Sequence, residues 1–319
     1  MDILLLLVGL GLILGGANYL TDGSAALALR FRVPEFIVGL TVVAVGTSMP
    51  ELVVSVLSAI AGNSSVAIGN VVGSNLFNTF VILGVCALIR PVALTAANIR
   101  RDIPFGVAAA LLLVVLASDS RLHPGATDGL GRGDGIAMLL LYVGLMVYTI
   151  RAVRRSAPVE PGSKEAPTSG KALWLVVTMI VGGLAALIAG GELFLRSATS
   201  IARHLGVSES VIAITLVAGG TSLPELASSV ISLLKGKADM ALGNVIGSNI
   251  ANILLILGLS ATIRPLSMGG ITTADLLMSL LGAVLLLVTA FTFRRRAIDR
   301  WEGAIFLTIY VVYIVRLLH

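Results

Sequence analysis

The feature that most constrains the fold of this chain is an internal duplication. Residues 41–91 align without a gap on residues 215–265 at a constant offset of 174, and 28 of the 51 aligned positions are identical. Two blocks are nearly unchanged between the copies: GTSMPEL at 46–52 with GTSLPEL at 220–226, and GNVVGSN at 69–75 with GNVIGSN at 243–249. A repeat of this quality predicts a fold built from two copies of one unit.

The chain that holds this duplicated unit has too few polar residues to form the surface of a water-soluble protein. Hydrophobic residues make up 57% of the 319 positions, charged residues only 12%, and the mean hydropathy is +1.01. Soluble domains are about 25% charged, so the composition predicts an all-α polytopic membrane protein. The net charge of +5 does not indicate a nucleic-acid partner, because Lys and Arg stand in short clusters between apolar segments.

Ten apolar segments, separated at charged, proline and glycine clusters, are predicted to cross the membrane as helices. Their ranges are 3–27, 35–60, 66–89, 103–118, 134–151, 172–202, 209–234, 240–263, 272–293 and 302–318. The first repeat is predicted over 1–151 and the second over 172–319, joined by a polar linker at 152–171. Because each repeat holds an odd number of helices, the second must insert upside down. Inverted repeats are typical of carriers that work by alternating access.

The distribution of Lys and Arg predicts the same topology. Loops that follow the first, third, fifth, seventh and ninth segments hold 16 of the 22 basic residues, and the opposite side holds 6. By the positive-inside rule the first set is cytoplasmic. We therefore expect a multi-pass plasma-membrane protein with the 152–171 linker in the cytoplasm and both termini outside. Segment 3–27 is expected to be the first span rather than a cleaved signal peptide.

Two glutamates lie near the middle of apolar segments, Glu51 in the second and Glu225 in the seventh. A charged group at the centre of a bilayer costs about 3 kcal/mol or more. Each glutamate follows a proline, which removes a backbone donor and leaves a carbonyl free one turn earlier, near Ala44 or Ala218. Free carbonyls at membrane depth are tolerated where they line a cavity. A buried protonated acid is the alternative, and duplication of the whole arrangement disfavours it.

Further oxygen-bearing side chains surround these breaks. The hydroxyl residues beside them are Thr47, Ser48, Thr221 and Ser222, with Ser55 and Ser229 four residues beyond the glutamates. Two polar stripes with a spacing of four run along neighbouring segments: Asn70, Ser74 and Asn78, and Asn244, Ser248 and Asn252. Such oxygens suit Na⁺ and Ca²⁺, whereas Zn²⁺ or Cu⁺ would require His or Cys, which these motifs lack. The alternative for the hydroxyls and amides, including Asn75 and Asn249, is hydrogen bonding between helices.

These motifs resemble the two α-repeats of the cation/calcium exchanger superfamily, specifically its sodium/calcium exchanger branch of prokaryotic type. The resemblance implies an electrogenic antiporter that exchanges several Na⁺ for one Ca²⁺ by alternating access. We expect no enzymatic activity and no cofactor, and we expect the chain to work as a monomer. The ion ligands that it implies here are Ala44, Thr47, Ser48, Glu51, Ser74, Asn78, Ala218, Thr221, Ser222, Glu225, Ser248 and Asn252. Asn70 and Asn244, equally placed by the spacing, are not ligands in the family.

Members of this superfamily differ in the residue at one predicted ligand position. Some members, including the potassium-dependent branch, place an aspartate where this chain has Asn252. With asparagine at both 78 and 252 the site holds two carboxylates, so dependence on K⁺ is disfavoured. The nearest alternative is a Ca²⁺/H⁺ or other cation/H⁺ antiporter, whose branch generally lacks the GTS hydroxyls. A cation channel and an intramembrane hydrolase are weaker alternatives, the latter because the predicted spans carry no nucleophile or zinc motif.

Overall fold

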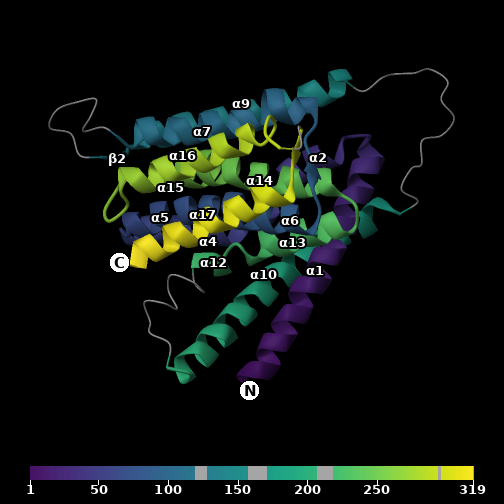
Figure 1. Cartoon of the computed structure of the whole chain (residues 1–319), viewed down its shortest axis with the longest axis horizontal. Coiled ribbons are helices and arrows are strands. Elements are labelled where there is room, and N and C mark those ends of the chain that lie inside the picture. Colours follow the sequence, from purple (N-terminus) through teal and green to yellow (C-terminus); the bar gives the residue numbers. More distant parts are fainter. Residues whose placement is uncertain (119–127, 157–170, 207–217, 294–295, 319) are drawn as a thin grey trace. The chain divides into compact units, whose positions relative to one another are not determined.

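The computed structural model describes residues 1–118, 128–156, 171–206, 218–293 and 296–318, and helices account for most of them (Figure 1). The helices of the first repeat are α1 (Asp2–Phe31), α2 (Glu35–Val38), η1 (Gly39–Val43), α3 (Ala44–Thr47), α4 (Met49–Ala61), α5 (Ser64–Leu76), η2 (Phe77–Ile82), α6 (Leu83–Ile89), η3 (Asn98–Asp102), α7 (Ile103–Leu116) and α9 (Arg132–Ser156). Those of the second are α10 (Leu173–His204), α12 (Ala218–Gly220), α13 (Leu223–Leu234), α14 (Ala238–Ile250), η5 (Ala251–Leu257), α15 (Gly258–Ile263), α16 (Thr273–Val288) and α17 (Arg300–Leu318). The elements written η are π-helical turns.

Each of the ten predicted segments coincides with one helix or with a run of consecutive helices, except that positions 209–217 lie outside the described residues. Within the described part of the chain, five helical runs are long and apolar enough to cross a membrane, or six if the broken run 35–61 is one span. The helices α13 and α16 are apolar but shorter. The prediction of a multi-pass helical membrane protein is therefore confirmed.

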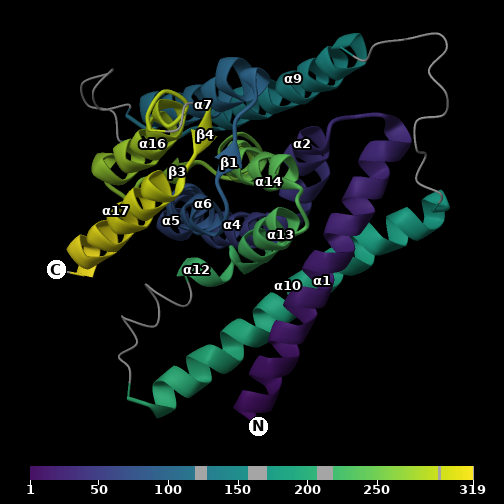
Figure 2. The same cartoon turned by 45° about the vertical axis from the view of Figure 1, so that its right-hand side comes forward.

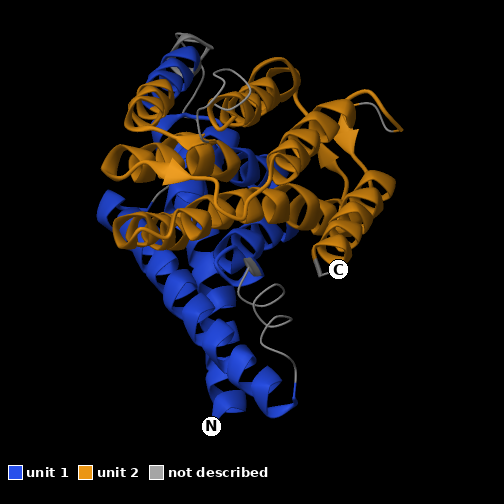
Figure 3. Cartoon of the chain, turned by 90° about the vertical axis from the view of Figure 1, so that its left-hand side faces the viewer, with its two compact units in different colours: residues 1–47, 143–247 blue, residues 48–142, 248–319 orange. Residues whose placement is uncertain are grey.

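The chain forms two compact units, and each combines segments from both predicted repeats (Figure 3). Unit 1 consists of residues 1–47 and 143–247, and unit 2 of residues 48–142 and 248–319. The units describe how the chain packs, whereas the predicted boundaries at 151 and 172 describe how the sequence repeats. The candidate site residues are accordingly divided between the two units.

In unit 1 the two longest helices, α1 and α10, cross with their backbones in close contact (Figures 1 and 2). A Cβ atom built on Gly16 would lie 2.7 Å from the carbonyl oxygen of Gly183, and one built on Gly9 would lie 3.0 Å from that of Gly190. Gly9 and Gly183 occupy equivalent repeat positions, and so do Gly16 and Gly190. Only glycine permits this approach, which places small residues where membrane helices cross closely.

In unit 2, two short antiparallel strand pairs join segments that are far apart in the sequence. The strands are β1 (Val92–Ala93) with β4 (Ala297–Ile298), and β2 (Gly129–Leu130) with β3 (Leu266–Ser267). β1 and β3 stand at equivalent positions, directly after the third and eighth predicted spans. Each pairs with the strand that precedes the last helix of the other repeat, so the two pairings are reciprocal.

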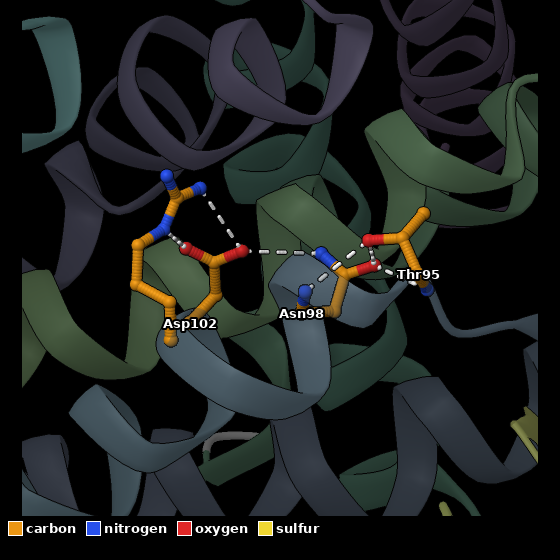
Figure 4. Close-up of polar contacts among 4 residues, drawn as sticks. Thr95, Asn98 and Asp102 are labelled. Atoms are coloured by element: carbon orange, nitrogen blue, oxygen red, sulfur yellow. Dashed lines mark hydrogen bonds and ion pairs between the residues drawn. The ribbon is translucent and has the colours of Figure 1, made fainter. Parts of the chain in front are cut away.

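A polar network that includes the buried residues Asn98 and Asp102 precedes α7 (Figure 4). The Oδ1 atom of Asn98 accepts from the backbone N–H of Thr95 at 2.9 Å, and the N–H of Asn98 donates to the hydroxyl of Thr95 at 3.2 Å. The other side of the Asn98 amide donates to Asp102, which forms an ion pair with Arg101 at 2.7 Å. The helix start is thus satisfied by side chains, as helix ends require.

The second repeat has a matching start at α16. Thr272 and Asp275 form a capping box, in which each side chain accepts from the backbone of the other. The first turns of α9 and α17 match in the same way: Asp134 and Glu302 each accept, at 2.7 Å, from the backbone N–H three residues earlier. The corresponding helices of the two halves therefore begin with side-chain caps of the same kind.

Candidate functional site

The first helix break lies between α3 and α4. Ser48, with φ −80° and ψ 10°, interrupts the helix, and α4 restarts at Met49 with Pro50 in its first turn. Glu51 follows in that turn and is fully buried. In unit 2 the hydroxyl of Ser74, on α5, donates to Glu51 Oε1 at 3.3 Å. The break thus presents a buried carboxylate whose orientation is supported from the neighbouring helix.

Asn70 ties this break to α5. Its Nδ2 donates to the backbone carbonyl of Glu51 at 3.1 Å and to the hydroxyl of Ser55 at 2.9 Å. Both of its amide hydrogens are therefore used in support of the backbone next to the carboxylate. These contacts agree with the family resemblance, which implied that Asn70 is not an ion ligand.

The second break, in unit 1, repeats the first. Ser222 has φ −90° and ψ 10°, and α13 restarts at Leu223 with Pro224 in its first turn. Glu225 follows and is 1% exposed. The same backbone angles at Ser48 and Ser222 follow from the same GTS-x-PE sequence, because proline cannot continue the hydrogen-bond ladder of the preceding turn.

Asn244, on α14, has the role of Asn70 at the second break. Its Nδ2 donates to the Glu225 carbonyl at 3.4 Å and to the hydroxyls of Ser228 and Ser229, both at 2.9 Å. Its Oδ1 accepts from the hydroxyl of Thr47 at 3.2 Å. In unit 1 the predicted ligand Thr47 is therefore linked to the Glu225 backbone through a single asparagine.

The predicted ligands divide evenly between the units. Unit 1 holds Ala44, Thr47, Ala218, Thr221, Ser222 and Glu225, and unit 2 holds Ser48, Glu51, Ser74, Asn78, Ser248 and Asn252. Apart from Ala218, whose side chain is not described, and Thr221, which is half-buried, all of them are buried. Buried polar groups without compensation are costly, so a concentration of oxygens at two helix breaks requires a physical reason.

Several of these polar atoms have no hydrogen-bond partner among the described residues. They are Oδ1 and Nδ2 of Asn78, Oδ1 of Asn252 and the hydroxyl oxygen of Thr221, all inaccessible to solvent. Most buried polar atoms in proteins are hydrogen-bonded, and exceptions call for an explanation such as a bound ion. Oxygens of these types are the ligands that hard cations select.

Both asparagines predicted as ligands stand on π-helical turns. Asn78 is the second residue of η2 and Asn252 the second residue of η5, and the two turns begin at equivalent positions, Phe77 and Ala251. A π-turn widens the helix and changes the direction of the side chains that follow, and such turns are frequent at functional sites. These π-turns are not predicted from the sequence, because a spacing of four residues fits a regular α-helix equally well.

A second set of asparagines connects these turns to their surroundings in unit 2. Asn252 Nδ2 donates to Asn75 Oδ1 at 3.0 Å, and Asn75 Nδ2 donates to the backbone carbonyl of Asn249 at 3.3 Å. Asn249 Nδ2 donates to the hydroxyl of Thr79 at 2.8 Å. The interpretation of Asn75 and Asn249 as interhelical hydrogen-bonding residues is thus supported by their contacts. Their duplication in both GSN motifs was the only signal in the sequence.

The fold and the two breaks define a class: a multi-pass membrane carrier whose buried oxygen ligands suit cations. The family model described as sodium/calcium exchanger protein matches residues 1–151 and 175–318. The chain therefore belongs to the sodium/calcium exchanger family, which confirms the family predicted from the GTS-x-PEL and GN-x-x-GSN blocks.

Individual relatives agree along nearly the whole chain. Sodium/calcium exchanger MaX1 of Methanosarcina acetivorans is 31% identical over 100% of this chain and 99% of its own length. Inner membrane protein YrbG of Escherichia coli is 35% identical over 82% of this chain and 79% of its own. The structure of the sodium-calcium exchanger NCX_Mj soaked with 10 mM Na⁺ and zero Ca²⁺ is similar with a TM-score of 0.83, at 30% identity and 98% coverage of both chains.

Proposed function

We propose that this chain is an electrogenic antiporter that exchanges Na⁺ for Ca²⁺ across the plasma membrane by alternating access. The observation that carries the proposal is the pair of buried glutamates, each in the first turn after a proline-containing helix break. Family membership and the likeness to MaX1 and NCX_Mj support the choice of ions. Two carboxylates neutralise one Ca²⁺ or two Na⁺, so a third Na⁺ would carry net charge.

The proposed ligands are the twelve residues predicted from the sequence and the resemblance. Ca²⁺ takes six to eight oxygens, and carboxylates, hydroxyls, amide oxygens and backbone carbonyls are all suitable. In the proposal, Glu51 and Glu225 both ligate Ca²⁺, and Na⁺ ions compete for these carboxylates and for the hydroxyl and carbonyl oxygens beside them. The competition for two charges couples the fluxes, because both cargoes cannot be neutralised at once.

Asn70 and Asn244 support this site without binding the ions. Each donates to the carbonyl of the glutamate at its own break and to the serine four residues beyond it. These bonds hold the backbone at the break in one geometry, which keeps the ligands in place during binding. Preorganised ligands bind more tightly because less freedom is lost on binding.

The proposed architecture is two inverted repeats of five helices, with the 152–171 linker in the cytoplasm, both termini outside, no cofactor and a functional monomer. The reciprocal strand pairs and the matched helix starts support the repeat. The clusters of Lys and Arg support the orientation. In this proposal α1 and α10 slide as a pair to open the ion site to each side in turn.

Flux into proteoliposomes tests the function. Vesicles loaded with Na⁺ are expected to take up Ca²⁺ when diluted into Na⁺-free medium, and the uptake should respond to membrane potential. A pH gradient imposed instead of the Na⁺ gradient is expected to drive little uptake. The opposite result, with uptake driven by pH and indifferent to Na⁺, would select the Ca²⁺/H⁺ antiporter.

A further inference from the structure

The contact between Asn75 and Asn252 decides which end of a ligand amide is available to a cation. An asparagine side chain has one oxygen that accepts and one nitrogen that donates. Only the oxygen can ligate a cation, so a ligand asparagine turned by 180° would present its NH₂ group and repel the ion. The orientation of the Asn252 amide therefore decides whether it can bind a cation, even when the position of the residue is unchanged.

The orientation of the Asn252 amide can be derived from a nearby atom that can only accept a hydrogen bond. The backbone carbonyl of Asn249 can only accept, so the Asn75 atom that lies 3.3 Å from it must be Nδ2. The other end of the Asn75 amide, Oδ1, then faces Asn252 at 3.0 Å and can only accept. Asn252 must consequently present Nδ2 to Asn75, and its own Oδ1 points elsewhere.

The oxygen so directed is buried. Asn252 is 1% exposed, and its Oδ1 has no hydrogen-bond partner among the described residues. Its helical turn η5 packs on α4 and α5, which carry Glu51 and Ser74. We infer that Asn75 is a positioning residue, which holds the Asn252 amide so that its oxygen, and not its nitrogen, is presented to the transported cation. This inference rests on the proposed function.

The repeat-equivalent hydrogen bond, from Asn78 to Asn249, is not formed. By the repeat, Asn249 would accept from Asn78, but Oδ1 of Asn249 has no partner among the described residues and neither end of the Asn78 amide has one. Asn249 instead donates to the hydroxyl of Thr79. The repeat has Ile253 in place of Thr79, so Asn75 has no such hydroxyl at the corresponding position. One pair of asparagines is therefore coupled, and the other is not.

A double-mutant cycle on the full chain in proteoliposomes tests the inference, with KM for Ca²⁺ and kcat measured in Na⁺-driven uptake. Asn75→Leu is expected to raise KM about fivefold, equivalent to the loss of one hydrogen bond, with a smaller change in kcat. Asn252→Ala is expected to raise KM at least as much. If Asn75 acts through Asn252, Asn75→Leu has no further effect on KM in the Asn252→Ala chain.

Thr79→Val is the control, because it removes a hydrogen bond from the same polar cluster and leaves the Asn249–Asn75–Asn252 chain of contacts intact. Its KM is expected to stay within about twofold of the unmodified chain, a change below 0.5 kcal/mol. Asn75→Ala repeats the test if the leucine variant does not fold.

Three outcomes would overturn the inference: an unchanged KM in Asn75→Leu, additive effects in the double variant, or an Asn252→Ala chain with normal KM. None of these coincides with failure of the proposed function, which would appear as absence of Na⁺-driven Ca²⁺ uptake by the unmodified chain.

Discussion

The two helix breaks carry nearly the same sequence, yet they are held by different numbers of contacts. At the first, Asn70 donates to the Glu51 carbonyl and to one serine, Ser55. At the second, Asn244 donates to the Glu225 carbonyl and to two serines, because the repeat has Ser228 where the first copy has Val54. The comparison teaches that a duplicated helix break keeps its glutamate and supporting asparagine while the contacts around each copy diverge.

The largest expected effect concerns the glutamates at the two helix breaks, and it tests whether exchange requires the negative charge of both. Glu51→Gln and Glu225→Gln are each expected to lower Na⁺-driven Ca²⁺ uptake by at least about a hundredfold, because a buried divalent cation then lacks half of its neutralising charge. The measurement is initial uptake into proteoliposomes at fixed protein density. Retained exchange in either variant would remove that glutamate from the site and break the equivalence.

The next effect concerns the crossing of α1 and α10. Gly16→Val is expected to reduce exchange about tenfold and to destabilise the protein by about 2 kcal/mol, since its Cβ would lie 2.7 Å from the Gly183 carbonyl oxygen. Gly15→Val is the matched control, because a Cβ there meets no atom within 4 Å. Thermal unfolding in detergent and uptake are measured together. Equal losses at the two neighbouring glycines would contradict the close crossing.

In the second repeat, Gly183→Val and Gly182→Val form the corresponding pair. A Cβ at Gly183 would lie 2.8 Å from the Gly16 carbonyl oxygen, and one at Gly182 meets no atom within 4 Å. Because Gly16 and Gly183 form the two sides of one contact, Gly183→Val should match Gly16→Val in size, whereas Gly182→Val should be close to neutral.

A smaller effect is expected where the two breaks differ. Ser228→Val makes the second break resemble the first. It removes the hydrogen bond from Asn244 and the one that Ser228 donates to the Glu225 carbonyl, so it should lower the free energy of unfolding by about 1–2 kcal/mol. The reciprocal change, Val54→Ser, gives the first break a serine at the same repeat position. The midpoint of thermal unfolding compares the two. A Ser228→Val chain as stable as the unmodified one would show that the additional contact contributes nothing.

The smallest effect is expected at a pair of charges on the unit 1 surface. Asp22 forms an ion pair with Lys235, and the equivalent of Asp22 in the second repeat is Arg196, which pairs with Glu192 on its own helix. The Asp22 side chain is 40% exposed, and such pairs contribute between 0 and about 1 kcal/mol. Asp22→Asn should therefore lower the unfolding midpoint by no more than a few degrees. A larger loss would mean that this contact between α1 and α13 has a structural role that its exposure conceals.

Much of the fold could be predicted because apolar length and duplication are properties of the sequence itself. Each of the ten predicted ranges contains a helix or a run of helices in its described residues, although the ninth extends past the end of α16 at Val288. The breaks before Glu51 and Glu225 follow from Pro50 and Pro224. The division into two compact units could not be predicted in this way, because packing between distant segments is not a local property.

The site was predicted by residue type but not by orientation. The spacing of four identified Asn78 and Asn252, yet it gave no indication that both lie on π-turns. Nor could it show that Asn252 contacts Asn75 while Asn78 lacks the corresponding contact. The two copies also differ at one neighbouring position, where Thr79 accepts from Asn249 and the repeat has Ile253.

The reciprocal strand pairs have a consequence for how the protein is made. β1 leaves the ribosome about 200 residues before its partner β4, and at about 5–20 residues per second this is a delay of about 10 to 40 seconds. During that interval β1 has no partner strand, because β4 has not yet been synthesised. Unit 2 can close only when the last helix has been synthesised. Factors that bind incompletely synthesised membrane proteins would act on the chain during this interval.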